Sequence, residues 1–548
     1  MIAALVSYEA ERRCQLLQNP KAINTPEARK KKRPLLRFAF SDNRLTGMPI
    51  LGIIYPPAHL ARLTDPLTLA QENLSTSPGA SPFAEIFQKA KNRVKSALDD
   101  IKVTQHTEGA ADEDWYWAAP VLMDLVHQPE AAAKWLEQTA LPQLWTGVEE
   151  EQDQESRWHE HVAKLRKLCA EFHAGSLELG RQPDDLVDVL TWIGISGPGS
   201  CCLRSLSRFG FSDCQLESRN AAATMAYGFL TLFNLPESMA IIRGARGGEE
   251  TVEPYWLQVL KYSAAGCLQS VLDEYVHILR ESLGRIDSPA AITLADIAQA
   301  VASVLRLRTS RVGYDHIFAK QRHHLKLKSQ FMRVRYAMRF GKQETEEGGE
   351  PTREDLVRAA FNSPFWPFVM ATTSIGQEGL DFHQYCHAIV HWNLPTNPVD
   401  LEQREGRIHR YKGHAVRKNL AQNYRHAISE GCDPWAAMFR KARLECSPGV
   451  SEIEPYWVLK GDASIERHVP AMPASIDEVR LAQLKRSVSL YRLAFGQLRQ
   501  ADLVDFLGSH LDQRRIDELS QTILLNLQPP ETTVISAPGS SQSPQRSP

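Results

Sequence analysis

The sequence predicts an α/β fold class: a lobe built on a parallel sheet, flanked by mainly helical N-terminal and C-terminal regions. Two short apolar runs, at residues 366–371 (WPFVMA) and 387–392 (HAIVHW), have the length and composition of buried parallel strands. Elsewhere apolar residues recur mostly with helical spacing, as in residues 185–193 (DLVDVLTWI) and 481–498 (LAQLKRSVSLYRLAFGQL).

Each apolar run leads into a block rich in polar residues. The blocks are residues 371–383 (ATTSIGQEGLDFH) and residues 400–414 (DLEQREGRIHRYKGH). Strands of an open α/β sheet deliver their loops to its carboxyl edge, where such folds bind ligands. Asn397 as N-cap and Pro398 at the first helical position predict a helix that starts there and runs through residues 400–410.

On this predicted helix Gln403, Arg407 and Arg410 fall at i, i+4 and i+7, so they share one face. Guanidinium groups are fixed-charge forks suited to phosphate, and an arginine from a second domain can stabilise a transferring phosphoryl group. The alternatives are a solvated helix face and, for the first block, a turn that needs glycine. The order of the blocks, their separation and the strand between them favour the functional interpretation.

The two blocks resemble motifs V and VI of the superfamily 2 helicases and translocases. The first block matches T-S-x-G-x-E-G-L-D and the second matches Q-x-x-G-R-x-x-R, most like the Swi/Snf-type and bacterial RNA-polymerase-recycling branch. Residues 352–363 (TREDLVRAAFNS) occupy the place of the helix that precedes motif V in that family. The resemblance covers roughly residues 330–418 and implies a RecA-like second motor lobe.

The resemblance also implies roles for individual residues. Arg407 and Arg410 would be arginine fingers on the γ-phosphate of ATP. The other residues would bind the nucleotide or the nucleic-acid backbone. The implied nucleotide-binding residues are Gly379, Asp381 and Gln403, and the implied backbone contacts are Thr373 and Ser374. ATP and Mg²⁺ would be shared with a first lobe, which would supply the lysine, the magnesium ligands and the water-activating carboxylate.

No first lobe is recognisable in the 548 residues, because no G-x-x-x-x-G-K-[ST] sequence occurs. The glycines of residues 194–200 (GISGPGS) lack the following lysine and hydroxyl, so a turn is predicted there. Asp273 and Glu274 imitate a DExx pair, but the apolar residues around them predict an amphipathic helix. The chain therefore resembles the C-terminal part of a helicase, as a split subunit, a truncated product or the result of a start-site error.

A basic segment spans residues 306–342, with eleven lysines and arginines against the single acid Asp315. Such clustering in a protein whose formal net charge is −2 is typical of contact with a phosphate backbone. Residues 332–340 (MRVRYAMRF) alternate in a way that predicts a strand with one basic face, and a solvated edge strand is the alternative. The candidate nucleic-acid-binding residues are Arg333, Arg335 and Arg339. The expected partners are nucleic acid, DNA in preference to RNA, and a P-loop/DExx lobe.

Composition reduces the kinds of site and cellular location that are expected for this protein. Nine cysteines without a C-x-x-C pair predict neither a zinc site nor a disulfide framework. The N-terminus lacks the features of a secretory signal, and residues 220–236 are too short to span a bilayer, so a cytoplasmic location without membrane contact is expected. The cations of residues 29–33 (RKKKR) are expected to lie in an exposed loop.

The predicted organisation has five parts. They are a mainly helical accessory region (1–250), a helical lead-in (251–300), the RecA-like lobe (301–450), a helical extension (451–528) and a disordered tail (529–548). Residues 76–82 and 149–155 are expected to be linkers, and the Trp-rich residues 115–126 are expected to be core. The alternative function is a non-catalytic nucleic-acid-binding or scaffold protein that keeps the lobe as a docking module.

Overall fold

The structure is a computed structural model, and it describes only part of the chain. The described residues are 34–41, 44–76, 83–106, 108–138, 141, 158–244, 253–284, 290–307, 310–320, 324–334, 337–340, 353–372, 381–428, 433–446, 453–470, 475–493 and 506–523. Four expected features lie outside them: residues 77–82 of the first linker, whose first residue Thr76 ends a helix, the second linker (149–155), the cations of residues 29–33 and the tail at residues 529–548.

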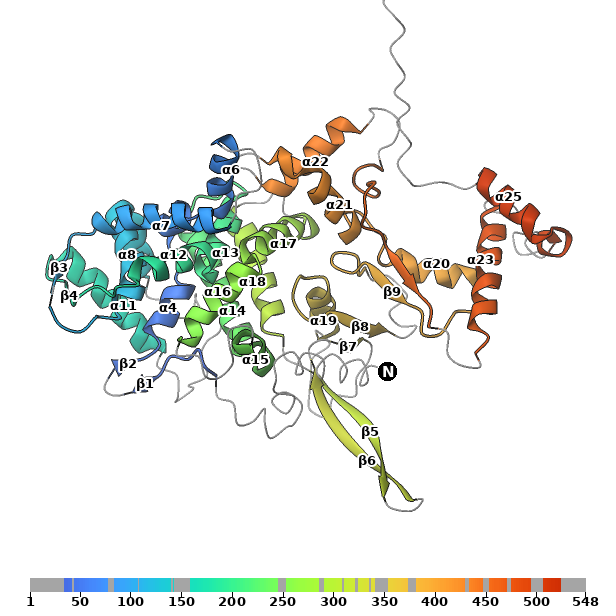
Figure 1. Ribbon diagram of the computed structural model, residues 1–548, viewed down its shortest axis with the longest axis horizontal. Coiled ribbons are helices and arrows are strands. Elements are labelled where there is room, and N and C mark those ends of the chain that lie inside the picture. Colours follow the sequence, from blue (N-terminus) through green and yellow to red (C-terminus); the bar gives the residue numbers. More distant parts are fainter. Residues whose placement is uncertain are drawn as a thin grey trace, which may run out of the picture. The chain divides into compact units, whose positions relative to one another are not determined.

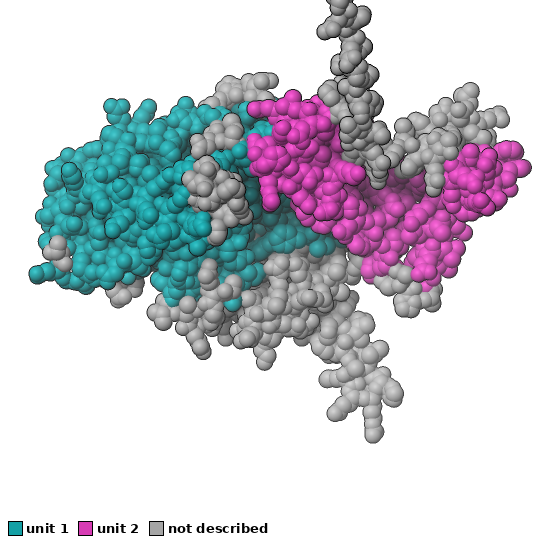
Figure 2. Space-filling view, turned by 45° about the horizontal axis from the view of Figure 1, so that its top comes forward, with its two compact units in different colours: residues 1–385, 428–437 teal, residues 386–427, 438–548 magenta. Residues whose placement is uncertain are grey.

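The chain divides into two compact units (Figure 2). Unit 1 comprises residues 1–385 and 428–437, and unit 2 comprises residues 386–427 and 438–548. The division falls within the region expected to form one lobe, because the strand that precedes the first block belongs to unit 1 and the strand that precedes the second block belongs to unit 2. Each unit is described by itself below.

Unit 1 is mainly helical, as the sequence predicted (Figure 1). Its helices are α4 (Met48–Ile54), α5 (Ala58–Leu63), α6 (Pro66–Thr76), α7 (Phe83–Asp99), α8 (Trp115–His127), α9 (Pro129–Leu136), α11 (Trp158–His173), α12 (Leu186–Ser196), α13 (Pro198–Ser207), α14 (Leu216–Phe233), α15 (Pro236–Gly244), α16 (Tyr255–Ala265), α17 (Leu268–Ser282), α18 (Ala290–Leu305) and α19 (Arg353–Phe361). Its strands are β1 (Phe40–Ser41), β2 (Arg44–Leu45), β3 (Thr104–Gln105), β4 (Glu178–Leu179), β5 (Ser310–Lys320), β6 (His324–Val334), β7 (Ala337–Phe340) and β8 (Val369–Thr372).

The core of unit 1 forms around α8, which is buried on nearly all sides, as expected of a helix that is apolar all round. Helices α4, α5, α9, α11 and α12 pack against it, and α14 packs against α13 and α18. Among the described residues of this unit, five tryptophans are buried, namely Trp115, Trp117, Trp135, Trp158 and Trp435. The prediction that residues 115–126 are core is confirmed.

Both imitations of motor motifs have structural roles in unit 1. The glycine run is a break between α12 and α13, with Gly197 as N-cap and Pro198 opening the second helix. A Cβ on Gly199 would lie 2.0 Å from the carbonyl oxygen of Tyr55, so this glycine allows close packing of two backbones. Asp273 lies on α17, which confirms the predicted helix.

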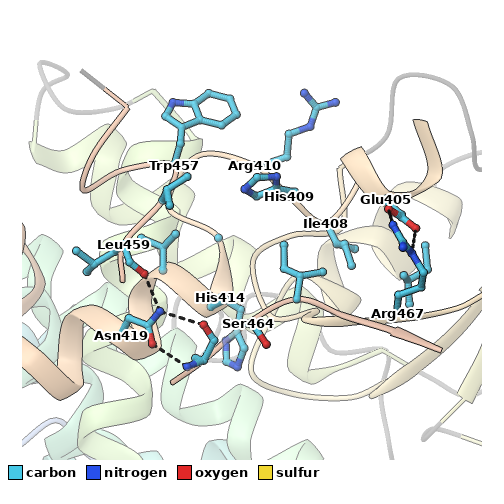
Figure 3. A pocket seen from close by; sticks show the side chains of 17 residues that line it. Glu405, Ile408, His409, Arg410, His414, Asn419, Trp457, Leu459, Ser464 and Arg467 are labelled. Carbon is cyan, nitrogen blue, oxygen red and sulfur yellow. Dashed lines mark hydrogen bonds and ion pairs between the residues drawn. The ribbon is translucent and has the colours of Figure 1, made fainter. Parts of the chain in front are cut away.

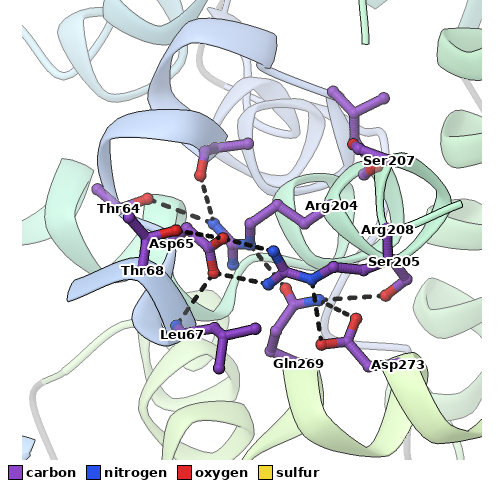
Figure 4. A network of polar contacts seen from close by, with 12 residues as sticks. Thr64, Asp65, Leu67, Thr68, Arg204, Ser205, Ser207, Arg208, Gln269 and Asp273 are labelled. Atoms are coloured by element: carbon purple, nitrogen blue, oxygen red, sulfur yellow. Dashed lines mark hydrogen bonds and ion pairs between the residues drawn. The ribbon is translucent and has the colours of Figure 1, made fainter. Parts of the chain in front are cut away.

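Asp273 belongs to a buried polar network (Figure 4). Arg208 donates from its two terminal nitrogens to Asp65, at 2.7 Å each, and its Nε lies 3.5 Å from Asp273. Gln269 donates to the other oxygen of Asp273 at 2.7 Å. The pKa of Asp273 is raised, because the effect of burial outweighs the contacts with Arg208 and Gln269, which lower the pKa. The network fixes α13 to α17 and to the segment that opens α6.

The described strands pair in two-stranded sheets. β5 and β6 form an antiparallel hairpin, in which Ser310 is opposite Val334 and Lys320 is opposite His324 (Figure 1). β7 pairs in parallel with β8, the strand that leads into the first block. The strand predicted for residues 332–340 is divided between β6 and β7, and residues 335–336 lie outside the described part of the chain.

Unit 2 holds the second block. Its elements are β9 (Ala388–Val390), α20 (Pro398–Gly406), α21 (His414–Tyr424), a 3₁₀ turn (Arg425–Ala427), α22 (Pro434–Glu445, whose first turn belongs to unit 1), β10 (Glu466–His468), α23 (Asp477–Leu493) and α25 (Gln513–Ile523). β9 pairs in parallel with β10. Leu394 and Leu401 pack with Leu484 of α23, so this helix of the C-terminal extension supports the helix of the second block.

The predicted strands are parallel, in agreement with the α/β class, but two expectations about them are wrong. β8 and β9 are not buried: Val369 of β8 and Val390 of β9 are 36% and 57% exposed. The described strands also do not join into one sheet, since β7–β8 and β9–β10 are separate pairs. Side chains point out of the faces of a sheet, so the exposure of Val369 and Val390 means that the face from which each of them points is left open.

No single described helix is both long and apolar enough to cross a membrane, although the bent pair α12 and α13 meets both conditions when the two helices are taken together.

Candidate functional site

Helix α20 starts where the sequence predicted. Asn397 has an extended backbone, and its side-chain oxygen accepts a hydrogen bond of 2.9 Å from the backbone N–H of Val399. Pro398 occupies the first turn, where its missing N–H costs no helical hydrogen bond. Asp400 also lies in the first turn, where a negative charge complements the helix dipole.

The end of α20 differs from the prediction. The helix stops at Gly406, with Arg407 as its C-cap, so Gln403 lies on the helix while Arg410 follows it in a turn. The expectation that Gln403, Arg407 and Arg410 share one helical face is therefore wrong. The carbonyl of Glu405 accepts from the backbone N–H groups of both Ile408 and His409, at 3.1 and 3.3 Å, which closes the helix in a tight turn.

Glu405 anchors this turn to the paired strands of unit 2 (Figure 3). Arg467 of β10 donates to both carboxylate oxygens of Glu405 at 2.5 Å, and Nε2 of the buried His391 lies 3.2 Å from Oε1. Burial raises the pKa of Glu405, but the hydrogen bonds from His391 and Arg467 outweigh it and bring the pKa to about 2. The carboxylate is thus ionised at neutral pH and holds the end of α20 against β9 and β10.

The C-terminal end of this turn is held by contacts of Lys412. Lys412 has a φ of 49°, in the left-handed region, and its N–H donates to the carbonyl of Tyr456 at 2.6 Å. Its ammonium lies 4.2 Å from the ring centroid of Phe439. The buried Arg417 donates to the carbonyl of Lys412 at 2.6 Å. Arg407 and Arg410 therefore lie on a short turn that is fixed at both ends.

Most of the first block lies outside the described residues, including Thr373, Ser374 and Gly379. Its end is described: Asp381 is exposed, and its carbonyl accepts a hydrogen bond of 2.7 Å from the side chain of Asn362, just after α19. The next residue, Phe382, is buried, with its ring 5.9 Å from that of Phe361. Asp381 belongs to unit 1, whereas Gln403, Arg407 and Arg410 belong to unit 2.

Two of the three candidate nucleic-acid-binding arginines lie on described strands. Arg333 of β6 is opposite Arg311 of β5, and Arg339 of β7 is paired with Ala371 of β8. Arg335 lies outside the described residues. The hairpin register thus brings two basic residues from opposite ends of the predicted basic segment into one pair.

Sequence reasoning missed the residues that hold the turn. Arg467 is 62 positions from Glu405, and Tyr456 is 44 positions from Lys412, so nothing in the spacing links them. Glu405 itself lies inside the block that the sequence singled out. The sequence offered a solvated helix face as the alternative for this block, and it gave no sign of the distant partners His391 and Arg467.

The comparisons with known proteins agree with the position of the blocks. Residues 299–412 match the family described as the helicase conserved C-terminal domain. No curated protein and no solved structure matches the chain significantly. The matched range ends in the turn after Arg410. It contains the basic segment, the first block and the second block as far as Lys412. Residues 299–412 therefore correspond to a helicase-type C-terminal lobe.

Proposed function

We propose that the chain serves as the C-terminal lobe of an ATP-dependent nucleic-acid helicase or translocase of superfamily 2, nearest to the Swi/Snf-like branch. The match of residues 299–412 to the helicase C-terminal domain carries this proposal. The first block and residues 400–412 of the second block lie inside that range, in the order expected of motifs V and VI. A first lobe with a P-loop and a DExx pair, on a partner or in a longer chain, completes the motor.

In this function Arg407 and Arg410 stabilise the charge on the γ-phosphate of ATP, with Mg²⁺ held by the first lobe. Their place on a turn fixed by Glu405 and Lys412 supports the role, because a guanidinium acts best when the backbone that carries it is held. The remaining roles are assigned by motif position. Gln403, Gly379 and Asp381 bind the nucleotide, and Thr373 and Ser374 contact the nucleic-acid backbone.

The nucleic-acid partner is DNA in preference to RNA, and it contacts the basic segment at residues 306–342. The charge of that segment supports the assignment, since neutralising phosphates is the main source of affinity in non-specific binding. Arg333, Arg335 and Arg339 are the proposed contacts. Contact with a phosphate backbone needs no base-specific groups, so binding is largely independent of sequence.

The decisive experiment joins the chain to a compatible first lobe and measures nucleic-acid-stimulated ATP hydrolysis. Arg407→Ala and Arg410→Ala should each lower turnover by about 10³- to 10⁵-fold, the effect of an arginine that stabilises transition-state charge. Lysine at either position should not restore full activity, because an ammonium cannot reproduce the guanidinium fork.

Arg404→Ala is the matched control. Arg404 lies on the same helix and donates to the carbonyl of Asn393 at 2.9 Å, so its loss should affect stability rather than turnover. If Arg407→Ala and Arg410→Ala leave turnover intact and lower the melting temperature, the two arginines are structural. If no first lobe restores ATP hydrolysis while nucleic acid still binds, the alternative of a non-catalytic nucleic-acid-binding or scaffold protein holds.

A further inference from the structure

Unit 1 contains a pocket of about 420 Å³ that no motif position assigns. It lies between α5, the first turns of α6, the helix α13 and the loop that follows α13. All the residues that line it belong to unit 1, so the pocket is formed within one compact unit. Its volume lies within the range of small-molecule sites, roughly 300–1,000 Å³.

The buried charged residues that line the pocket, which we call its floor, belong to the polar network of Figure 4. Arg204 donates to neutral oxygen and sulfur atoms of the neighbouring segments. Arg208 donates to both oxygens of Asp65 and lies beside Asp273. The formal charges of these two arginines and two aspartates cancel. The floor therefore presents no net charge to a ligand, and its polar groups are held by one another.

The rim of the pocket carries a second pair of charges, Arg62 and Asp213, whose side chains are 58% and 22% exposed. Nε of Arg62 donates to Oδ2 of Asp213 at 3.2 Å. Among the described residues, the two terminal nitrogens of Arg62 have no hydrogen-bond partner. The other oxygen of Asp213 accepts from the thiol of Cys214, a weak donor, at 3.3 Å. Both members of the pair therefore keep hydrogen-bonding capacity for a charged ligand.

The loop that carries Asp213 is held in shape by its own backbone. Gly210 has a φ of 80°, in the left-handed region that favours glycine, and its N–H donates to the carbonyl of Ser207 at 3.0 Å. Phe211 follows, lines the pocket and packs partly against the core of unit 1. The pocket thus has an apolar wall beside the rim charges, and it is formed before any ligand binds.

We propose that this pocket binds a free α-amino acid with an apolar side chain. The α-carboxylate accepts from the two terminal nitrogens of Arg62, a fork that matches carboxylate geometry. The α-ammonium donates to Asp213, and the side chain lies against Phe211. One carbon separates the two charged groups of an α-amino acid, which suits a guanidinium and a carboxylate that are already 3.2 Å apart.

The charge balance also favours a zwitterion. The rim pair and the floor are each formally neutral, so a ligand of zero net charge leaves the pocket neutral, whereas a simple anion or cation leaves one charge uncompensated. The site uses residues of unit 1 alone. It goes beyond the proposed motor function, and its test is independent of ATP turnover.

The test is a ligand-observed NMR titration of the full chain with leucine, methionine and phenylalanine. Leucine is then compared with leucinamide, which lacks the carboxylate, and with isocaproate, which lacks the ammonium. At about pH 6 leucinamide keeps its proton. Leucine should bind about 10- to 150-fold more tightly than either analogue, the effect of one hydrogen-bonded charge.

Two variants of the rim assign the contacts. Arg62→Gln should remove the difference between leucine and leucinamide, and Asp213→Asn should remove the difference between leucine and isocaproate. Both residues are on the rim, so the variants should fold. Arg93→Gln is the matched control, because Arg93 forms a partly exposed ion pair with Glu72 in the same unit and does not line the pocket.

Phe211→Ala should weaken binding of all three amino acids, and Phe211→Leu should keep most of it, since leucine preserves an apolar wall. The proposal is overturned if none of the three amino acids binds, or if leucine binds no better than its two analogues. It is also overturned if Arg62→Gln and Asp213→Asn both bind leucine as the wild type does. None of these results affects the arginine test with a first lobe.

Discussion

His414, at the start of α21, is a histidine that the fold keeps neutral. Its ring lies 5.4 Å from that of His387, and burial, together with the charge of Arg417, lowers its pKa to about 4. A histidine in an unfolded chain has a pKa of about 6.5. The folded state therefore binds fewer protons than the unfolded state between these two values, and stability rises with pH across that window.

We predict that unit 2 keeps this contribution above about pH 6.5 and loses up to about 3 kcal/mol as the pH falls toward 4. His414→Gln should flatten the dependence, because glutamine does not titrate. The measurement is the free energy of unfolding from urea titrations between pH 4 and 8. His468→Gln is the control, since that histidine is exposed on β10. An unchanged slope in His414→Gln would contradict the assignment.

Single residues also show where sequence reasoning stopped. Asn397 and Pro398 could be placed because capping depends on neighbouring residues alone, and the structure confirms both. Glu405 could not be assigned, because its partners His391 and Arg467 reach it only through the pairing of β9 with β10.

At the scale of elements, the helix of the second block ended earlier than its periodicity suggested. Residues 400–410 keep helical spacing, but Gly406 is a weak helix former and Glu405 forms an ion pair with Arg467. Tertiary contacts therefore ended the helix at Gly406. The strands β8 and β9 were found in the correct places, whereas their exposure could not be anticipated, because burial depends on which strands and helices cover them.

The network around Arg208 makes a prediction about α13 and α17. Arg208→Met would leave Asp65 and Asp273 buried without their cation, which typically costs about 3–5 kcal/mol. Unfolding of unit 1 in urea measures the loss. Replacing Arg208 together with both carboxylates, in Arg208→Met with Asp65→Asn and Asp273→Asn, should recover part of the stability, because neither carboxylate is then left buried without its cation. A triple variant as unstable as the sum of its single variants would show that the network is not coupled.

The basic segment predicts a salt dependence. If it follows a phosphate backbone, the logarithm of the binding constant should fall by about 0.7–0.9 per contact for each log unit of salt. Replacing Arg333, Arg335 and Arg339 by alanine should flatten that slope, measured by fluorescence anisotropy with DNA of varied sequence. A matched triple variant of Arg440, Lys441 and Arg443 on α22 should keep it. An unchanged slope in the folded first variant would place the contact elsewhere.

At the scale of the molecule, composition and periodicity were enough to predict a helical N-terminal half and a parallel α/β element after it. They were not enough to predict two units. The chain leaves unit 1 after Tyr385, returns for residues 428–437 and leaves it again. The hydrogen bond between His277 and Asp433, at 2.5 Å, ties this returning segment to α17. Such a crossing depends on contacts between residues far apart in the sequence, which a single sequence does not reveal.

The last prediction is that the purified chain does not hydrolyse ATP, whether or not it binds nucleic acid. The 548 residues contain no P-loop, and the two sequences that imitate motor motifs have structural roles. Gly199 packs against the backbone of Tyr55, and Asp273 forms an ion pair with Arg208. A chain without the phosphate-binding lysine and the magnesium ligands should hydrolyse ATP at no more than background rate, with or without nucleic acid and Mg²⁺. Phosphate release by the purified chain measures this rate.

The Arg410→Ala variant should show the same background rate, because an arginine finger has no effect where the reacting phosphate is not bound by a first lobe. Magnesium-dependent turnover that persists through purification and disappears in Arg410→Ala would mean that this chain carries the whole catalytic apparatus, and the assignment as a lobe that needs a partner would be wrong.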